Sequence, residues 1–530
     1  MNDLRGTSVL VLGLGDSGLA MARWCAPLCA QVRVWDSRWD SPPGPPQAAA
    51  LAEFVPAALR IEGPLTGQAL LGIHRILKSP GLAPNDARIA PLLKQAREAG
   101  IAVQGELDVF IQALRDLQVE YDYTPRIVAV TGTNGKTTTT AMAAQLIART
   151  GKRVATAGNI GPTLLQTLAD LLAPQAGAAS RAAELSASLP EVWVLELSSF
   201  QLDGVTGFEP DAAALLNITE DHLDWHGGMA QYTAAKARIF GPRTVRVLNR
   251  DDEGIARLAR EPMPPAAQRR GTGKVRASLG GPRVVWFGLD APRRPGDFGL
   301  LAEDGMAWLV RAQVDEDMPR RGAVAPAEEL HVQRLMPADG LRVRGRHNAA
   351  NALAALALAT AIGCPLAPML HGLREYRGEP HRVEHLGSAA GVDFFDDSKG
   401  TNVGATVAAL NGLGADRLPA KLVVILGGDG KGQDFAPLRD PVQRLVRAVA
   451  TIGKDAPGIE AALDGLGLKL ARHATLEAAT QWCFEQAHSG DAVLLSPACA
   501  SLDMFRNYGH RAEVFAQAYR SIASERGELN

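Results

Sequence analysis

The chain has 530 residues, which is more than one hydrophobic core usually supports and predicts about three domains. Its 46% apolar and 21% charged residues are typical of a globular protein, and a formal net charge of −2 provides no field for binding nucleic acid. There is neither a signal-peptide pattern nor an apolar run near 20 residues, and the five cysteines are scattered. We therefore expect a cytoplasmic protein with no membrane span and no structural zinc site.

The first unit begins with a predicted strand at 8–12, the turn GLGDSG at 13–18, a helical segment and a second strand at 31–35 that ends at Asp36. This order matches the G-x-G-x-x-G fingerprint, with an acidic residue about 20 positions on. Taken alone, the fingerprint predicts NAD. Its glycines, however, specify only a tight turn and a close approach of the backbone to some phosphorylated ligand. A later strand at 73–78 ends in Ser-Pro-Gly, where a doubly wound sheet would hold the same ligand.

A polar connector at 115–125 precedes a β-branched strand at 126–131, the turn GTNGKT at 132–137 and a helix. Backbone N–H groups and the positive end of that helix suit a phosphate group. Lys136 would contact the β- and γ-phosphates of ATP, and Thr137 would bind Mg²⁺. The common phosphate loop has a glycine six residues before its lysine, but this chain has Val130 there. An ordinary strand–turn–helix connection is the alternative.

Two more buried strands follow in the same unit, at 192–195 and 212–216. The first ends in Glu196, and an acid at the end of such a strand usually holds Mg²⁺ after a phosphate loop, although a surface acid would fit the pattern too. The second leads to NITEDH at 217–222 and a helix at 232–240. Asn348 and Asn351 share one face of a later helix, where they would read a base edge or cap the helix start.

The last unit alternates strands and helices from residue 379 onward. Its strands at 392–395, 422–426 and 492–495 are each followed by polar or glycine-rich residues, which predicts a ligand site at one sheet edge. Three stretches rich in Ala, Ser, Pro or Arg are predicted to be loop insertions, at 173–190, 260–275 and 311–328. The chain is thus an α/β protein of three domains, 1–116, 117–378 and 379–530.

Taken together, these motifs resemble the Mur ligase family over nearly the whole chain apart from the insertions. The most specific pieces are GTNGKT at 132–137, LELSSFQ at 195–201, NITEDH at 217–222, GRHN at 345–348, PHR at 380–382, DSKGTN at 397–402 and LLSPACASLD at 494–503. The resemblance implies an N-terminal Rossmann-like UDP-binding domain, a central P-loop ATPase-type α/β domain and a C-terminal Rossmann-like α/β domain that binds the amino acid and closes over ATP.

Within the family, the G-x-G-x-x-G beginning is similar to that of the members that add D-glutamate. The Asn-Pro-Arg signature of the relatives that add a diamino acid is absent. The resemblance therefore implies ATP-dependent joining of D-glutamate to UDP-N-acetylmuramoyl-L-alanine through an acyl phosphate and a tetrahedral intermediate, in the cytoplasmic stage of peptidoglycan precursor synthesis. We expect a monomer whose partners are these small molecules, not nucleic acid.

The resemblance also implies roles for individual residues. Those at the reaction centre are Lys136, Glu196, His222 and Lys236. Two Mg²⁺ ions would be held, one by Thr137 and Glu196 and the other by His222 and Lys236, with Lys236 carrying a CO₂-derived carbamate. ATP would be bound by Gly132, Thr133, Asn134, Gly135, Lys136, Thr137, Thr138, Asn348, Asn351, Arg382, Asp397 and Lys399. The UDP-substrate would be bound by Gly15, Asp16, Ser17, Asp36, Ser37, Arg38, Ser79, Gly81, Asn159 and Gln201. D-glutamate would be bound by Thr401, Lys431, Ser501, Leu502 and Tyr508, the last of which replaces a phenylalanine familiar in the family.

Three other hypotheses stay open at this point. An NAD-linked oxidoreductase would explain the first turn but not the phosphate loop, Glu196 or His222. A regulatory or motor NTPase would hydrolyse ATP without an amino acid. A relative that adds a different amino acid, such as folylpolyglutamate synthase, is disfavoured by the UDP-type first domain.

Overall fold

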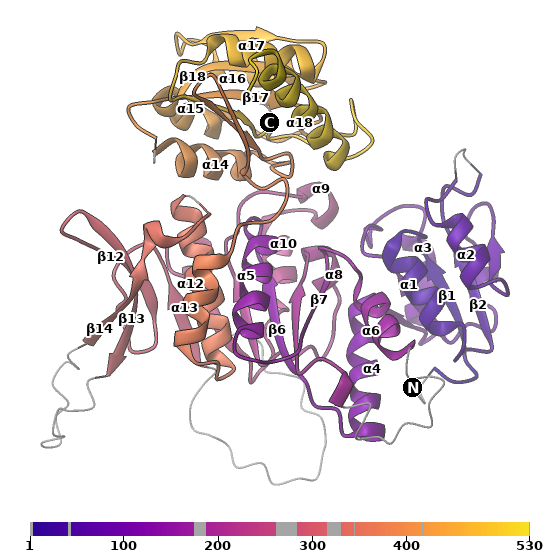
Figure 1. Ribbon diagram of the computed structural model, residues 1–530. Coiled ribbons are helices and arrows are strands. Elements are labelled where there is room, and N and C mark those ends of the chain that lie inside the picture. The colour runs from indigo at the N-terminus through magenta and orange to yellow at the C-terminus, as the bar shows by residue number, and fades with distance from the viewer. Residues whose placement is uncertain are drawn as a thin grey trace, which may run out of the picture.

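A computed structural model describes residues 4–40, 44–173, 187–260, 283–314, 330–343, 345–415 and 417–528. Within these ranges the chain forms three α/β bodies, each built on a mainly parallel sheet, and one small antiparallel sheet (Figure 1). The α/β class predicted from the sequence is confirmed. The predicted insertions fall largely outside the described residues.

The N-terminal body is a five-stranded parallel sheet in the order β3-β2-β1-β4-β5. The register pairs Leu12 of β1 with both Trp35 of β2 and Lys78 of β4, so the turns that follow these strands meet at one edge. Its elements are β1 (Ser8–Leu12), α1 (Asp16–Cys25), β2 (Gln31–Trp35), α2 (Ala48–Phe54), β3 (Leu59–Ile61), β4 (Arg75–Lys78), α3 (Ala90–Glu98), β5 (Ala102–Gln104) and α4 (Glu106–Tyr121).

Helix α4 corrects one sequence prediction. The stretch at 115–125 was predicted to be a polar connector, but its first seven residues are the end of α4. The helix forms because Phe110, Leu114 and Leu117 recur at helical spacing and are buried, and Phe110 packs edge-on against Trp193 at 5.1 Å between ring centroids. The proposed domain limit at residue 116 therefore falls inside a helix that joins two bodies.

The middle body is a six-stranded parallel sheet in the order β11-β10-β9-β6-β8-β7. Strand β6 lies between β8 and β9, so Val130 pairs with Glu196 and Thr131 pairs with Leu215. Its strands are β6 (Arg126–Thr131), β7 (Val154–Gly158), β8 (Val192–Glu196), β9 (Ala212–Leu215), β10 (Val245–Asn249) and β11 (Val284–Phe287). Its helices are α5 (Lys136–Ala148), α6 (Leu164–Leu172), α8 (Ser199–Leu202), α9 (Leu223–His226), α10 (Met229–Ala237), α11 (Glu253–Leu258), α12 (Arg346–Ala361) and α13 (Leu366–Glu375).

A three-stranded antiparallel sheet beside α12 was not predicted from the sequence. It consists of β12 (Phe298–Glu303), β13 (Met306–Val314) and β14 (Leu330–Pro337). Residues 311–314, predicted to begin an insertion, are instead the end of β13. The sheet forms because Phe298, Leu309 and Met336 share a buried cluster with the apolar face of α12.

The C-terminal body has the strand order β15-β16-β20-β17-β18-β19, and only β15 runs antiparallel to its neighbour among the pairs described. Strand β20 lies between β16 and β17, so the polar segments that follow these three strands meet, as predicted. The elements are β15 (Glu384–Ala389), β16 (Val392–Asp396), α14 (Val403–Ala415), β17 (Leu422–Gly427), α15 (Arg439–Leu445), β18 (Val446–Ile452), α16 (Ala456–Leu463), β19 (Lys469–Arg472), α17 (Leu476–Gln486), β20 (Ala492–Leu495) and α18 (Tyr508–Glu525).

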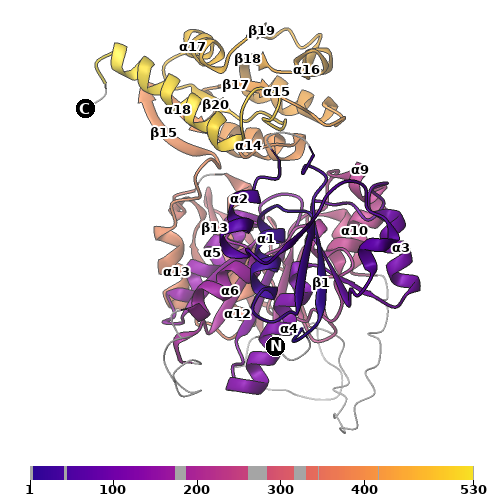
Figure 2. The same cartoon turned by 90° about the vertical axis from the view of Figure 1, so that its right-hand side faces the viewer.

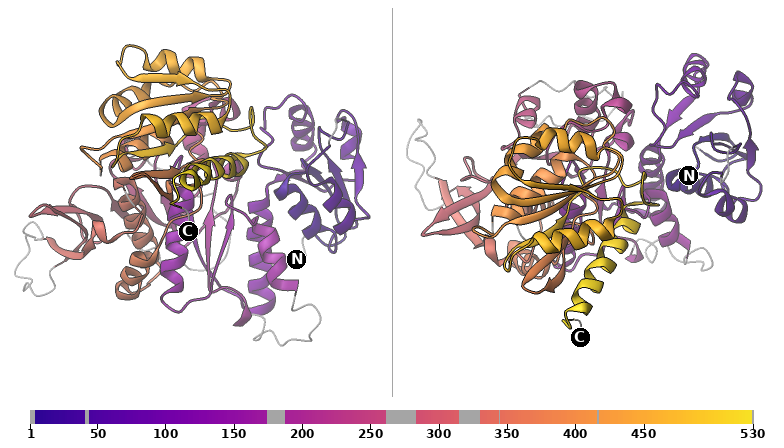
Figure 3. Two further views of the ribbon diagram at one scale, coloured as in Figure 1. Left: turned by 45° about the horizontal axis from the view of Figure 1, so that its top comes forward. Right: turned by 90° about the horizontal axis from the view of Figure 1, so that it is seen from above.

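The three bodies are arranged around the middle one. Figure 1 shows the C-terminal body above it and the N-terminal body at its side, next to α4 and α6, and in Figure 2 the N-terminal body lies in front of the middle one. Seen from above, the C-terminal body covers the middle body and leaves the N-terminal body largely uncovered (Figure 3). In the described part of the chain, no helix combines the length and apolar character needed to span a membrane.

Candidate active site

The phosphate loop connects the centre of the middle sheet to α5. Val130 is fully buried in β6, so the position that carries a glycine in the common loop belongs here to a strand. The turn begins at Gly132 and ends at Gly135, which has a φ of +79° and caps α5. A Cβ atom on Gly135 would lie only 2.6 Å from Oδ1 of Asn351. Only glycine suits this position, because it needs both the left-handed backbone and the close approach.

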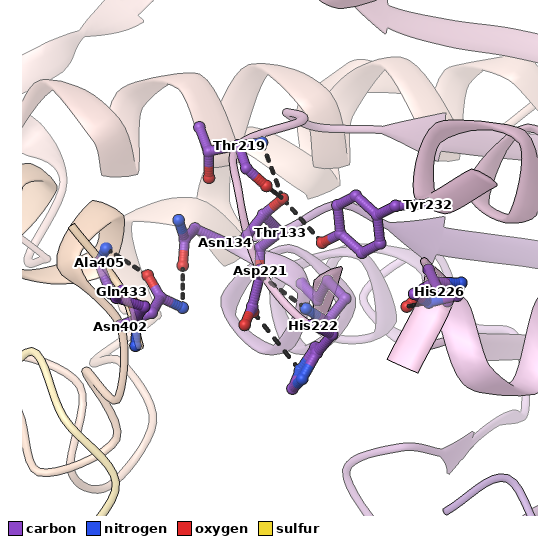
Figure 4. A network of polar contacts seen from close by, with 12 residues as sticks. Thr133, Asn134, Thr219, Asp221, His222, His226, Tyr232, Asn402, Ala405 and Gln433 are labelled. Carbon is purple, nitrogen blue, oxygen red and sulfur yellow. Dashed lines mark hydrogen bonds and ion pairs between the residues drawn. The ribbon is translucent and has the colours of Figure 1, made fainter. Parts of the chain in front are cut away.

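The loop is held in shape by the segment after β9, as Figure 4 shows. The backbone N–H of Thr133 donates to the carbonyl of Asn217 at 3.0 Å, and that of Asn134 donates to Oδ1 of Asn217 at 2.7 Å. The hydroxyl groups of Thr133 and Tyr232 lie 3.0 Å apart. Neither Asn217 nor Tyr232 was among the site residues predicted from the sequence. Asn217 is the first residue of the NITEDH motif, and Tyr232 begins the helix predicted after it. These positions were the sequence features that could have marked both residues.

Three cationic side chains gather around this loop. Lys136 Nζ donates to the carbonyls of Gly132 at 2.9 Å and Thr133 at 2.8 Å, and Lys236 Nζ donates to the same Gly132 carbonyl at 2.8 Å. Arg382 reaches across from the start of the C-terminal body and donates to Oγ1 of Thr137 at 2.6 Å. Burial lowers the pKa of both lysines, and that of Lys236, which is 1% exposed, falls well below its ordinary value. Such an arrangement attracts an anion.

Glu196 provides a carboxylate beside these cations. It is 1% exposed, and its Oε1 accepts a hydrogen bond from Nδ2 of Asn159 at 2.8 Å. Its Oε2 is buried and has no hydrogen-bond partner among the described residues. A buried carboxylate oxygen without such a partner and a hydroxyl group such as that of Thr137 are oxygen ligands of the kind that Mg²⁺ prefers, so these residue types fit the predicted ion.

His222 and its neighbours form the other side of the centre. The residue has a left-handed backbone with a φ of +53°, and its ring packs on Phe200 at 4.6 Å between centroids. Nε2 lies 3.5 Å from Oδ2 of Asp221, yet burial together with Lys431 and Lys136 holds the pKa of His222 below its ordinary value. A neutral imidazole is the form that binds a metal ion.

A cavity of about 250 Å³ opens between the loop, α12 and the C-terminal body. Asn348 and Asn351 line it, as expected of residues that read a base. Asn351 also donates a hydrogen bond to Asn348 at 3.2 Å. The alternative role, packing at the start of the helix, is therefore compatible with the structure too. Asp397 closes the cavity from the C-terminal side, where it accepts a hydrogen bond from Ser496 Oγ at 2.7 Å. Burial raises the pKa of Asp397 to about 7.

The residues predicted to bind D-glutamate lie at the ends of the C-terminal strands. Lys399 Nζ lies 5.5 Å from the ring centroid of Tyr508, and Leu502 is 73% exposed. Lys431 is exposed with a φ of +52°, and its charge acts on His222 across the domain boundary. Ser501 is buried, and Thr401 is partly buried between Lys399 and α14.

Arg511 positions this region and was missed by the sequence analysis. It is fully buried in α18 and donates to the carbonyls of Ser398 at 2.8 Å and Cys499 at 3.2 Å. These bonds tie together the loops that carry Lys399 and Ser501. An arginine in a helical sequence is ordinarily solvated, so no local signal marked it.

The residues predicted to bind the UDP-substrate surround the turn after β1. Asp36 is 4% exposed, and its two oxygens accept hydrogen bonds from the backbone N–H of Leu14 at 2.6 Å and of Arg38 at 2.9 Å. Ser79 Oγ donates to the carbonyl of Gly13 at 2.8 Å. The carboxylate thus shapes the turn. The remaining residues lie on the same turns: Gly15, Asp16 and Ser17 at the start of α1, Ser37 after β2, and Gly81 after β4.

Two further residues predicted to contact the UDP-substrate come from the middle body. Asn159 is exposed at the end of β7 while it holds Glu196. Gln201 accepts hydrogen bonds at 3.0 Å from the backbone N–H and the hydroxyl of Ser198, and so closes the capping box of α8.

Comparison with known proteins follows the same division of the chain. Three family descriptions match it: the Mur ligase MurD-like N-terminal domain at 7–105, the Mur ligase middle domain at 130–270 and the Mur ligase glutamate ligase domain at 381–499. The chain is 56% identical to a UDP-N-acetylmuramoylalanine–D-glutamate ligase of Albidiferax ferrireducens, over 99% of this chain and 98% of the relative. It is 54% identical to the protein of that name from Burkholderia mallei, over 99% of both chains.

Solved structures share the fold at low sequence identity. The UDP-N-acetylmuramate–alanine ligase MurC of Thermotoga maritima matches with a TM-score of 0.53 and 19% identity over 97% of this chain and 99% of the other. The MurF ligase of Thermotoga maritima in complex with ADP matches with a TM-score of 0.54 and 17% identity over 87% of this chain and 91% of the other.

The geometry of Gly135 generates a first prediction. Gly135→Ala should weaken binding of Mg²⁺-ATP by about tenfold or more, because a Cβ atom strains a left-handed position and contacts Asn351. Gly151→Ala is the matched control, since Gly151 has a φ of +85° but no atom within 4 Å of the added Cβ. Calorimetric titration with a non-hydrolysable ATP analogue measures both. Equal affinities in the two variants would contradict the role assigned to the loop.

The buried carboxyl of Asp397 predicts a pH dependence of stability. Its pKa is about 7 in the folded state, well above the value of an ordinary aspartate. Between pH 4 and pH 7 the unfolded chain therefore loses this proton while the folded protein keeps it, and the free energy of unfolding falls as the pH rises. Relative to Asp397→Asn, the wild-type protein should lose up to about 4 kcal/mol over this range. Thermal denaturation of both proteins at several pH values tests this, with Asp440→Asn as a control because Asp440 is an exposed carboxylate. Parallel curves for wild type and Asp397→Asn would refute it.

Proposed function

This chain belongs to the Mur ligase family, and on that premise we propose that it joins D-glutamate to UDP-N-acetylmuramoyl-L-alanine with the hydrolysis of ATP to ADP and phosphate. Relatives with this activity in their names match it from end to end. The structural observation that carries the proposal is the cluster of Lys136, Lys236 and Arg382 around a phosphate loop with an unpartnered Glu196 oxygen beside it. The reaction belongs to the cytoplasmic stage of peptidoglycan precursor synthesis.

The chemistry explains why ATP is needed. A carboxylate resists attack by an amine, because it is anionic and has no good leaving group. Transfer of the γ-phosphoryl group to the L-alanyl carboxylate gives an acyl phosphate, and the amine of D-glutamate then attacks its carbonyl carbon. The tetrahedral adduct collapses with loss of phosphate. Lys136 and Arg382 stabilise the negative charge that spreads over the phosphoryl oxygens during transfer.

Each body of the protein holds a different reactant in this proposal. The turns that carry Asp36 and Ser79 bind the uridine diphosphate part, because the turns after β1, β2 and β4 meet at one edge of the N-terminal sheet. Asn348 and Asn351 contact the adenine base in the cavity beside the loop. Lys431 binds a carboxylate of D-glutamate, which requires a cation, and the hydroxyls of Thr401 and Ser501 donate to its carboxylate oxygens. Lys399 contacts ATP. All of these residues come from one chain, and we propose that a monomer is active.

Two Mg²⁺ ions complete the proposed site. Thr137 and Glu196 would hold one, and His222 together with Lys236 would hold the other. When bound, the ions neutralise charge on the phosphates of ATP and on the attacked carboxylate.

Lys236 can serve as a ligand only if its charge is reversed, since an ammonium group repels a metal ion. We propose a carbamate, formed when the neutral amine attacks CO₂ and releases one proton. The reaction requires a neutral amine, and burial next to Lys136 lowers the pKa of Lys236 well below its ordinary value. The amine also lies within 2.8 Å of the Gly132 carbonyl, which directs it toward the phosphate loop.

Phosphate release tests the proposed reaction. With UDP-N-acetylmuramoyl-L-alanine and ATP, release should require D-glutamate and should be absent with L-glutamate, L-lysine or diaminopimelate. Lys136→Met should reduce turnover at least about a hundredfold, since it removes a charge that stabilises the transition state. Comparable turnover with any other amino acid would overturn the assignment.

The carbamate has its own test. After equilibration with ¹³C-bicarbonate, the wild-type protein should show a carbamate signal in its ¹³C NMR spectrum, and Lys236→Ala should lack both this signal and activity while keeping a wild-type melting curve. Lys94→Ala is the control, because Lys94 is an exposed lysine on α3. A fully active Lys236→Ala enzyme would exclude the carbamate.

A further inference from the structure

Two cysteines at the end of α1 have no part in the proposed ligase reaction. Cys25 is the last residue of the helix and is fully buried, whereas Cys29 is partly exposed. The backbone N–H of Cys29 donates to the carbonyl of Cys25 at 2.8 Å, so the two residues are one helical turn apart. Their Cα atoms are then about 6 Å apart, within the range that a disulfide bridges.

The surroundings give the two thiols different reactivities. The neighbouring Cys25 thiol lowers the pKa of Cys29 to about 7, with a smaller contribution from the Thr7 hydroxyl, whose oxygen lies 3.8 Å from the Cys29 sulfur. The positive charge of Arg75 on β4 acts in the same direction. The same contact raises the pKa of Cys25. Cys29 is thus the accessible nucleophile, and Cys25 is a protonated thiol placed behind it.

We propose that Cys25 and Cys29 form a peroxide-reactive dithiol that closes to an intramolecular disulfide. The Cys29 thiolate attacks one oxygen of hydrogen peroxide, and the O–O bond breaks. The released hydroxide takes up a proton and leaves as water, and Cys29 is now a sulfenic acid. The sulfur of Cys25 then attacks the Cys29 sulfur, the S–O bond breaks, and the thiol proton leaves with the hydroxyl as a second water. The two thiols lose two electrons, and the peroxide gains them.

The other cysteines lack these features. Cys364, Cys483 and Cys499 are all buried, and burial raises the pKa of each, in the case of Cys499 to about 12. Oxidation should therefore be selective for the pair at the end of α1. Cys25 also protects Cys29, because closing the disulfide removes the sulfenic acid before a second peroxide oxidises it to the irreversible sulfinic acid.

The dithiol is distinct from the proposed substrate site. Helix α1 has its first residue beside the glycine turn and its last at Cys25, about 15 Å away along the helix axis. Cys29→Ser should accordingly leave the basal ligase rate unchanged. The inference does not depend on the proposed function, since its readout is the oxidation state of two sulfurs.

The test uses the full-length reduced protein, treated with a small excess of hydrogen peroxide, quenched with N-ethylmaleimide under denaturing conditions and analysed by mass spectrometry. We expect a loss of two hydrogens, three alkylated cysteines, and a link between Cys25 and Cys29 that dithiothreitol reverses. Because trypsin cleaves after Arg23 and Arg33, both cysteines lie on one peptide, which should be unalkylated and two hydrogens lighter. Failure to find this link, or oxidation of Cys364, Cys483 or Cys499 at the same rate, would overturn the proposal.

Single variants separate the two roles. In the Cys25→Ser variant, Cys29 should be oxidised further to the sulfinic acid, seen as a gain of two oxygens on its peptide. In the Cys29→Ser variant, Cys25 should stay reduced. Cys483→Ser, which alters a buried cysteine outside the pair, should still form the disulfide as the wild type does. Equal resistance of Cys29 to over-oxidation with and without Cys25 would refute the resolving role.

Discussion

The active site depends on an excess of positive charge held at the phosphate loop. The carbonyl of Gly132 accepts hydrogen bonds from both Lys136 and Lys236, and Arg382 binds the Thr137 hydroxyl on the other side of the loop. Charges this close repel one another by several kcal/mol at an effective dielectric constant near 20. Among the described residues, backbone carbonyls, one hydroxyl and nearby acids compensate these charges. A triphosphate would relieve that repulsion, and Lys136 and Arg382 would then provide both affinity and the catalytic field.

The sheet order explains why the loop can be so short. Strand β6 lies between β8 and β9, and its pairing brings Val130 beside Glu196 and Thr131 beside Leu215. The proposed metal ligand and the segment that holds the loop are therefore fixed by main-chain hydrogen bonds of neighbouring strands. A glycine at Val130 would weaken this strand without lengthening the turn. The departure from the common loop is thus a consequence of the sheet.

Much of this arrangement could be predicted from the sequence, because the strands are apolar runs that end in glycine or charged residues. The turn at Gly132, the acid at Glu196 and the polar ends of the C-terminal strands all carried such local signals. Interactions between distant segments carried none: Arg511 ties Ser398 to Cys499, and the Asp36 carboxylate accepts a hydrogen bond from the backbone N–H of Leu14. The sheet of β12, β13 and β14 was not predicted, because its apolar residues are buried by contact with another element, α12, and no local pattern shows that contact.

The crowding of cations also bears on Lys236. An ammonium group that is 1% exposed and close to Lys136 is unfavourable in its charged form, and this lowers its pKa. Neutralisation alone would relieve the repulsion, but a carbamate, as proposed, would replace a positive charge with a negative one and add oxygen ligands. The charge of the loop would then be balanced closely enough for two divalent ions and a triphosphate to bind together. The crowding of positive charge that disfavours an ammonium group at Lys236 is therefore the feature that prepares its modification.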